Sequence, residues 1–231
     1  TSVAYGYDKA KHLAEVFQGK RQGYNYGRQL NPTVTALQKR ITKMESGLSS
    51  IGFSTGMAAI SSTLLALLKT GDHVISSSFL FGNTNSFFET LKRLGVEVSF
   101  VDATQAKFVE EAVRENTKIV FTETIANPVT QVADLAGIGE ICKDKNLVYI
   151  VDNTMTSPFS FKPKNVGASL IVNSLTKYIG GHGNALGGMI TDTGIHNWET
   201  FDNIIETYRS EKPELWGITQ IKKKGLRDLG S

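Results

Sequence analysis

Residues 147–177 read LVYIVDNTMTSPFSFKPKNVGASLIVNSLTK and contain two short apolar runs, each followed by polar side chains. The first run, 147–151, leads directly into Asp152, and the second, 170–173, leads into Ser174 and then Lys177. Leucine, β-branched and aromatic side chains dominate both runs. Short continuous apolar runs of this kind are typical of strands that are buried on both faces of a sheet.

The rest of the chain repeats the same pattern. Similar runs predict strands at 50–53, 73–77, 96–101, 119–123 and 189–191. Apolar residues at helical spacing predict a helix through Val34, Leu37, Ile41 and Met44, and further helices at 59–68, 87–94 and 135–145. This alternation predicts an α/β fold, a mostly parallel seven-stranded sheet with helices on both faces.

The first 33 residues lack this pattern. Residues 19–31 are rich in Gly, Gln, Asn, Tyr and Arg, which predicts an irregular arm that lies on another surface. We therefore divide the chain into an arm, residues 1–33, and a large domain, residues 34–231.

Composition excludes several classes of protein. The 231 residues are 40% hydrophobic and 20% charged, as in an ordinary folded domain. A formal charge of +3 is too small to indicate nucleic acid or an anionic membrane as the main partner, and no apolar run approaches the roughly 20 residues that cross a bilayer. The four histidines show no metal-ligand spacing and Cys142 is the single cysteine, so we expect no metal site. A single cysteine also fits a reducing compartment, and we therefore expect a cytoplasmic protein.

Polar residues directly after the predicted strands are the candidates for chemistry, because ligands of open α/β sheets bind beyond the carboxyl ends of the strands. Ser54-Thr55-Gly56-Met57 connects a strand to a helix through small residues, whose free N–H groups suit a phosphate. Taken alone, the segment is more typical of a tight turn with Ser54 or Thr55 as the helix N-cap. Ser174 and Thr176 would add hydroxyl donors to the same phosphate if the two strand ends meet, because a spacing of two residues keeps both side chains on one side of the chain.

An acid and a lysine follow two of the strands. Asp152 leaves an apolar strand where an unpaired charge is costly, so we expect a cationic partner such as a pyridinium nitrogen, although a lone aspartate more often caps its own loop. A lone lysine is usually a solvated surface charge. Lys177, however, follows a buried strand among hydroxyls and glycines, where an amine can become the nucleophile that forms an imine.

Five segments, in this order, resemble the Cys/Met-metabolism family of pyridoxal-phosphate enzymes. They are YGRQLNPT (26–33), STGMAAI (54–60), ETIANP (123–128), VDNT (151–154) and NSLTKYIGGHG (173–183). The resemblance covers essentially the whole chain. SLTKYIGGHG is most similar to the sulfhydrylase branch of the family, whereas the lyases and cystathionine synthases more often carry SATK with SGHG.

The resemblance implies the large domain of a fold-type-I transferase that uses pyridoxal 5'-phosphate. Lys177 would hold the cofactor as a Schiff base and move protons on the substrate, and Asp152 would pair with the pyridinium N–H. The other cofactor-binding residues that the resemblance implies are Thr55, Gly56, Met57, Ser174 and Thr176 for the phosphate, Asn127 for the ring hydroxyl and Phe81 for stacking on the ring.

The arm acquires a role from the same resemblance. Tyr26 and Arg28 match residues that, in this family, reach the phosphate of a neighbouring subunit. The resemblance therefore implies a homo-oligomer, at least a dimer and by expectation a dimer of dimers.

The sequence departs from the family pattern in two respects. Phe81 stands where many relatives carry a tyrosine, so it offers stacking without a phenol, although some members with sulfhydrylase activity also carry Phe. The family also has residues before Thr1 and a smaller carboxyl-terminal domain whose arginine grips the substrate carboxylate. We expect that small domain to be absent from this chain, and neither Arg209 nor Arg227 is assigned its role.

The function implied by the resemblance is γ-replacement on O-acetyl-L-homoserine by sulfide or a thiol, giving homocysteine or methionine and acetate. Methionine γ-lyase and cystathionine γ-synthase or lyase are the alternatives within the family. A noncatalytic fragment that binds pyridoxal phosphate or serves assembly is the alternative from another class.

Overall fold

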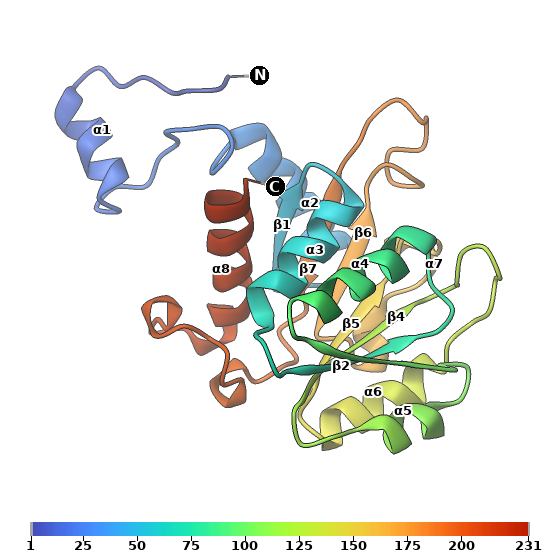
Figure 1. Ribbon diagram of the computed structural model, residues 1–231. Coiled ribbons are helices and arrows are strands. Elements are labelled where there is room, and N and C mark those ends of the chain that lie inside the picture. The colour runs from blue at the N-terminus through green and yellow to red at the C-terminus, as the bar shows by residue number, and fades with distance from the viewer. Residues whose placement is uncertain (1, 231) are drawn as a thin grey trace.

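Seven short strands form one sheet in the computed structural model, which describes residues 2–230 (Figure 1). In the order of their positions across the sheet they are β1 (Ser49–Phe53), β7 (Gly188–Asp192), β6 (Leu170–Ser174), β5 (Val148–Asp152), β4 (Thr117–Glu123), β2 (His73–Ser77) and β3 (Glu97–Val101). Thr1 and Ser231, the outer ends of the predicted arm and large domain, lie outside the described residues.

The sheet is mostly parallel, as predicted. Within it, β3, β2, β4, β5 and β6 pair in parallel, whereas β7 is antiparallel to both β6 and β1. All seven predicted strands are confirmed, each within two residues at either end.

Helices cover both faces of the sheet, and strand alternation divides the core into two layers. On one face, α3 (Gly56–Leu67), α4 (Gly82–Arg93) and α8 (Trp216–Lys222) pack on side chains such as Phe121 and Ile150. On the other face, α5 (Ala106–Ala112) and α6 (Leu135–Asp144) pack on Val120 and Tyr149. Because successive strand residues point to opposite faces, neighbours along β4 and β5 belong to different layers.

Helix α2 (Pro32–Met44) confirms the predicted helix, but most of the apolar side chains that predicted it are not buried. The Asn31 side chain caps it by accepting hydrogen bonds from the backbone N–H groups of Thr33 and Val34, and proline fits its first turn. Of the four apolar residues whose spacing predicted the helix, only Ile41 is buried, and Val34, Leu37 and Met44 remain exposed.

The arm contains a helix that the sequence did not predict, α1 (Ala10–Phe17), which has no buried residue and lies apart from the sheet in Figure 1. Residues 19–31 are irregular as predicted, apart from an isolated bridge between Ala4 and Tyr26. Other unpredicted helical segments are α5, α7 (Ser157–Ser160), α8, the π-helix Lys223–Leu229, and the 3-10 turns Pro163–Val166, Trp198–Thr200, Glu206–Tyr208 and Pro213–Leu215. No helix within residues 2–230 combines the length and apolar character that a membrane span requires.

We expect Gly139→Ala to lower the free energy of unfolding by about 3 kcal/mol, because overpacking forces backbone to shift. A Cβ at Gly139, in α6, would lie 1.8 Å from the carbonyl oxygen of Val166. Urea unfolding measures the change. Gly82→Ala is the matched control, because a Cβ at Gly82 meets nothing within 4 Å. Equal midpoints for both variants would contradict the prediction.

Candidate active site

Three polar residues end adjacent strands at one edge of the sheet: Glu123 on β4, Asp152 on β5 and Ser174 on β6. Each lies two positions after a residue of the core layer that contacts α3 and α4. Because side chains two apart share a face, all three point to the α3 side of the sheet. The fold therefore gathers their polar groups at one position.

The first turn of α3 lies against the end of β6. Thr55 is its N-cap, and the Thr55 hydroxyl accepts a hydrogen bond from the Ala58 N–H at 3.0 Å. A Cβ at Gly56 would lie only 2.8 Å from the Ser174 Cβ, so glycine permits this close approach. The tight-turn interpretation is thus correct for Thr55, and the first N–H groups of α3, which have no acceptor within the helix, lie beside Ser174.

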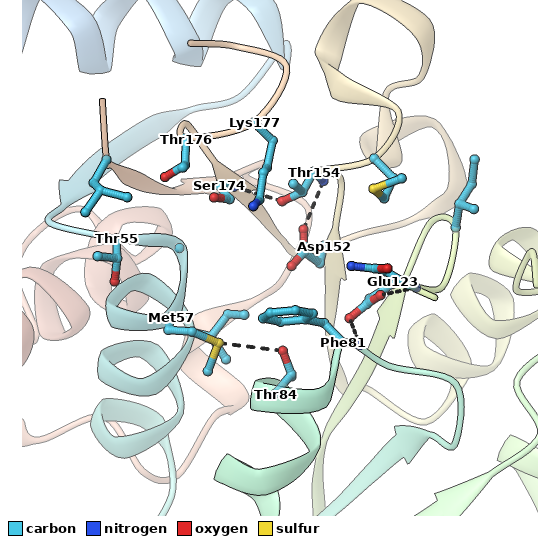
Figure 2. A pocket seen from close by; sticks show the side chains of 16 residues that line it. Thr55, Met57, Phe81, Thr84, Glu123, Asp152, Thr154, Ser174, Thr176 and Lys177 are labelled. Carbon is cyan, nitrogen blue, oxygen red and sulfur yellow. Dashed lines mark hydrogen bonds between the residues drawn. The ribbon is translucent and has the colours of Figure 1, made fainter. Parts of the chain in front are cut away.

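A cavity of about 220 Å³ opens at this edge of the sheet (Figure 2). It is lined by nine of the eleven predicted site residues: Thr55, Gly56, Met57, Phe81, Asn127, Asp152, Ser174, Thr176 and Lys177. Lys177 is exposed, forms no ion pair with another described residue, and directs its amine into the cavity above Asp152 in Figure 2.

Tyr26 and Arg28 do not line this cavity. The Arg28 guanidinium lies over the Tyr26 ring, 5.4 Å from its centroid, and donates hydrogen bonds to the carbonyl oxygens of Leu226 at 2.5 Å and Arg227 at 3.2 Å. In this chain Arg28 contacts both Tyr26 and the carboxyl-terminal helical segment. Their predicted role in a neighbouring subunit stays a prediction.

Asp152 caps its own loop, as one of the two interpretations of its sequence position predicts, and the cationic partner stays a prediction. Its Oδ1 accepts a hydrogen bond from the Thr154 N–H at 2.9 Å, which caps the following loop. The same carboxyl lines the cavity without a cationic partner among the described residues. Removal from water raises the pKa of Asp152, and the hydrogen bonds from Thr154 act against that rise.

The hydroxyl of Thr176 already has backbone partners. It accepts a hydrogen bond from the Gly187 N–H at 3.2 Å and lies 3.4 Å from the Gly187 carbonyl oxygen. Close to Thr176 in the chain, the Ser174 N–H donates to the Thr154 hydroxyl at 2.8 Å. Thr154 therefore links the ends of β5 and β6, a contact that the sequence did not predict.

Glu123 also lines the cavity, although the sequence analysis did not name it as a site residue. Its Oε1 accepts from the Phe81 N–H at 2.7 Å and its Oε2 from the Asn127 N–H at 3.2 Å, so one carboxyl holds both ring-binding candidates. Burial, and secondarily the charge of Asp152, raise the pKa of Glu123 to about 7, against the effect of both N–H donors. Its position at the end of an apolar strand, like that of Asp152, was the available signal.

Comparison with known proteins identifies the family. The model of the Cys/Met metabolism PLP-dependent enzymes matches residues 1–211. The chain belongs to this family. O-acetyl-L-homoserine sulfhydrylase from Leptospira meyeri is 33% identical over 248 residues, covering 99% of the chain and 56% of that protein. L-methionine gamma-lyase from Fusobacterium nucleatum subsp. polymorphum is 40% identical over 200 residues, covering 86% of the chain and 50% of that protein.

A solved structure agrees with the fold and the cofactor. A Campylobacter jejuni protein assigned as an O-acetylhomoserine (thiol)-lyase, with N'-pyridoxyl-lysine-5'-monophosphate in its crystal structure, superimposes with a TM-score of 0.87 at 32% identity. The match covers 99% of this chain and 60% of that one. The predicted fold-type-I large domain and the predicted cofactor, pyridoxal 5'-phosphate, are thereby confirmed. The chain spans about half the length of the curated relatives it matches.

The cavity suits that cofactor chemically. It combines the amine of Lys177, the carboxyl of Asp152 without a cation of its own among the described residues, and the first turn of α3, whose N–H groups favour an anion. Residues 2–230 contain no group of three His, Cys, Asp or Glu side chains that could hold a metal ion.

The raised pKa of Glu123 predicts a pH-dependent contribution to stability. A carboxyl whose pKa rises on folding stabilises the protein fully below its ordinary pKa, and the contribution is lost as the pH rises through the folded value, here about 7. In cofactor-free protein, we expect the stability of wild type relative to Glu123→Gln to fall by about 2 kcal/mol between pH 4.5 and pH 7. Urea unfolding across this range tests the prediction, and parallel profiles would contradict it.

Proposed function

We propose that this chain carries the cofactor site of an enzyme that replaces the acetoxy group at Cγ of O-acetyl-L-homoserine with sulfide or a thiol, giving homocysteine or methionine and acetate. One observation carries the proposal: Lys177 and Asp152 line the same cavity. The segment SLTKYIGGHG supports this reaction over the lyase and cystathionine alternatives, and a sulfhydrylase is similar across 99% of the chain.

The two charged groups have complementary tasks in this proposal. The Lys177 amine would bind the cofactor covalently, and the Asp152 carboxylate would accept a hydrogen bond from the protonated ring nitrogen. When bound, the cofactor supplies an electron sink for the charge that develops on a substrate carbon as its proton leaves. The cation it brings also offsets the cost of burying Asp152.

The phosphate belongs at the amino end of α3. The N–H groups of Gly56 and Met57 and the hydroxyl of Ser174 would donate to it, and the positive end of the helix dipole would favour its charge. Thr55 and Thr176, whose hydroxyls already have backbone partners, support this role mainly by shaping the turn and the loop beside it.

Glu123 holds the two residues that would contact the ring. Phe81 would stack on the ring and the Asn127 side chain would donate to the ring hydroxyl, while the carboxyl of Glu123 keeps the backbone of both residues in position. Because Phe81 has no ionisable group, proton transfer falls to Lys177. Once the substrate amine has replaced it on the cofactor, the Lys177 amine would remove a proton from the substrate Cα and then one from Cβ. After acetate has left from Cγ and sulfide has added at the same carbon, protons would return to Cβ and Cα.

Assembly is part of the proposal. Apolar side chains on the arm and α2 are exposed in the single chain, with Phe17 68% and Leu37 41% accessible. Such exposed apolar residues favour contact with a second subunit, consistent with an arm that carries Tyr26 and Arg28 to a neighbour's phosphate in a dimer of dimers. The buried single cysteine, Cys142, fits the cytoplasmic location that we expect.

Replacing the proposed lysine tests the site. We expect Lys177→Ala to abolish the visible absorption of the lysine-bound cofactor in the purified full chain, because the covalent link is lost. Lys143→Ala, which removes an exposed lysine from α6, is the matched control and should retain the band. A Lys177→Ala spectrum like that of wild type would reject the assignment.

The reaction itself is tested by its products. We expect the full chain, incubated with O-acetyl-L-homoserine and sulfide, to release acetate and homocysteine at a rate well above that of α-keto acid and ammonia. Predominant release of keto acid and ammonia would instead favour the lyase alternative. Cofactor binding without any turnover would favour the noncatalytic alternative.

A further inference from the structure

Two buried asparagines lie directly beside the proposed site on neighbouring strands. Asn153 follows Asp152 at the end of β5, and Asn173 precedes Ser174 in β6. Both are fully buried. Because strand neighbours point to opposite faces, the asparagine side chains lie on the face of the sheet away from the cavity and from α3.

Glu45 joins the two asparagines. It directly follows α2, is completely buried, and uses one oxygen, Oε1, to accept from the Asn153 side-chain amide at 3.0 Å and from the Asn173 amide at 2.7 Å. Asn153 also donates to the Phe161 carbonyl oxygen at 3.0 Å. One carboxyl oxygen therefore ties together the ends of β5 and β6, the two strands that carry Asp152 and Ser174.

Two buried oxygens of this cluster have no hydrogen-bond partner, Glu45 Oε2 and Asn173 Oδ1. Both are acceptors if Glu45 is ionised, and leaving buried acceptors unsatisfied is costly. A proton on Glu45 Oε2 converts one of them into a donor. The carboxylic acid and the Asn173 amide can then form a two-bond pair, with the amide donating to Oε1 and the acid donating to Oδ1.

The electrostatics around Glu45 agree with a bound proton. Burial raises the pKa of Glu45, although the hydrogen bonds from Asn153 and Asn173 and the charge of Lys162 act in the opposite direction. The Lys162 amine itself lies 3.3 Å from the Ser46 hydroxyl, to which it donates. No ion pair with Glu45 is present among the described residues.

On the cavity side of the sheet, hydrogen bonds of a single residue, Thr154, join the same two strand ends. Thr154 donates from its N–H to Asp152 and accepts from the Ser174 N–H (Figure 2). Glu45 is the counterpart of Thr154 on the opposite face, and it adds a connection to α2. Without Glu45, two buried asparagine amides lose their shared acceptor.

We propose that Glu45 is a positioning residue of the cofactor site: carrying a proton, it pairs with Asn173 and anchors Asn153, and so fixes the separation of Asp152 and Ser174. This inference rests on the proposed roles of those two residues in binding the cofactor ring and phosphate. Glu45 does not line the cavity and acts through the strand ends.

Three variants of the full chain test the proposal: Glu45→Gln, Glu45→Met and Asp192→Asn. Glutamine has the shape of the protonated acid and can donate to Asn173, whereas methionine fills the space but accepts nothing. Asp192, also fully buried, accepts from the Gly194 N–H and the Trp198 indole at the other end of β6 and β7, and it lines no cavity described here. It is the matched control for loss of a buried acid.

The readouts are the affinity of the cofactor-free protein for pyridoxal 5'-phosphate, the visible circular dichroism of the bound cofactor, and the thermal midpoint. We expect Glu45→Gln to bind within about twofold of wild type and Glu45→Met to bind at least about tenfold more weakly, with an altered dichroic band. Asp192→Asn should lower the midpoint and leave affinity and dichroism unchanged. If Glu45→Met does not fold, Asn173→Ala supplies the same test with Glu45 intact.

Each other outcome overturns a stated part of the proposal. Wild-type affinity and dichroism in Glu45→Met, with only a lower midpoint, would reduce Glu45 to a structural role. If Glu45→Gln binds pyridoxal 5'-phosphate as weakly as Glu45→Met does, the proposal that Glu45 carries a proton is rejected. These results are separable from failure of the proposed function, which Lys177→Ala reports through the absorption band.

Discussion

The central constraint of this structure is that β4, β5 and β6 run parallel and end at one edge of the sheet, and that the side chains of their last residues point to the same face. Glu123, Asp152 and Ser174 then point to the same face, and the first turn of α3 closes against them through the contact of Gly56 with Ser174. A shift of one residue in any of these strands would turn its polar group to the opposite face. The continuous apolar runs that bury both faces therefore also determine the composition of the cavity.

That arrangement places two carboxyl groups close together at a position that is largely removed from water. Glu123 and Asp152 lie close enough for the charge of one to raise the pKa of the other, and neither has a cationic partner among the described residues. The two acids are differently satisfied, since Glu123 has a backbone donor on each oxygen and Asp152 one on a single oxygen. Asp152 is thus the acid that still requires a positive partner, which is the electrostatic reason for assigning it to the ring nitrogen.

Features determined by local sequence could be predicted, and those determined by distant contacts could not. The strands follow from apolar runs, and Asp152 and Lys177 became candidates because each follows a buried strand, Asp152 directly and Lys177 a few residues later. By contrast, Glu45 is 108 residues from Asn153 and 128 residues from Asn173, so no spacing reveals the cluster. Glu123 acts on the Phe81 N–H, 42 residues away. The helices α5 and α8 have only seven residues each, too few for a periodic signal.

Helix α1 shows the limit of what a single subunit can stabilise. It has eight residues, no side-chain hydrogen bond at its N-cap and no buried residue. Isolated helices of this length are marginal in water, because nucleation costs more than so few hydrogen bonds return. If a second subunit supplies the missing surface, helix content in the arm is governed by mass action and rises as the protein is concentrated.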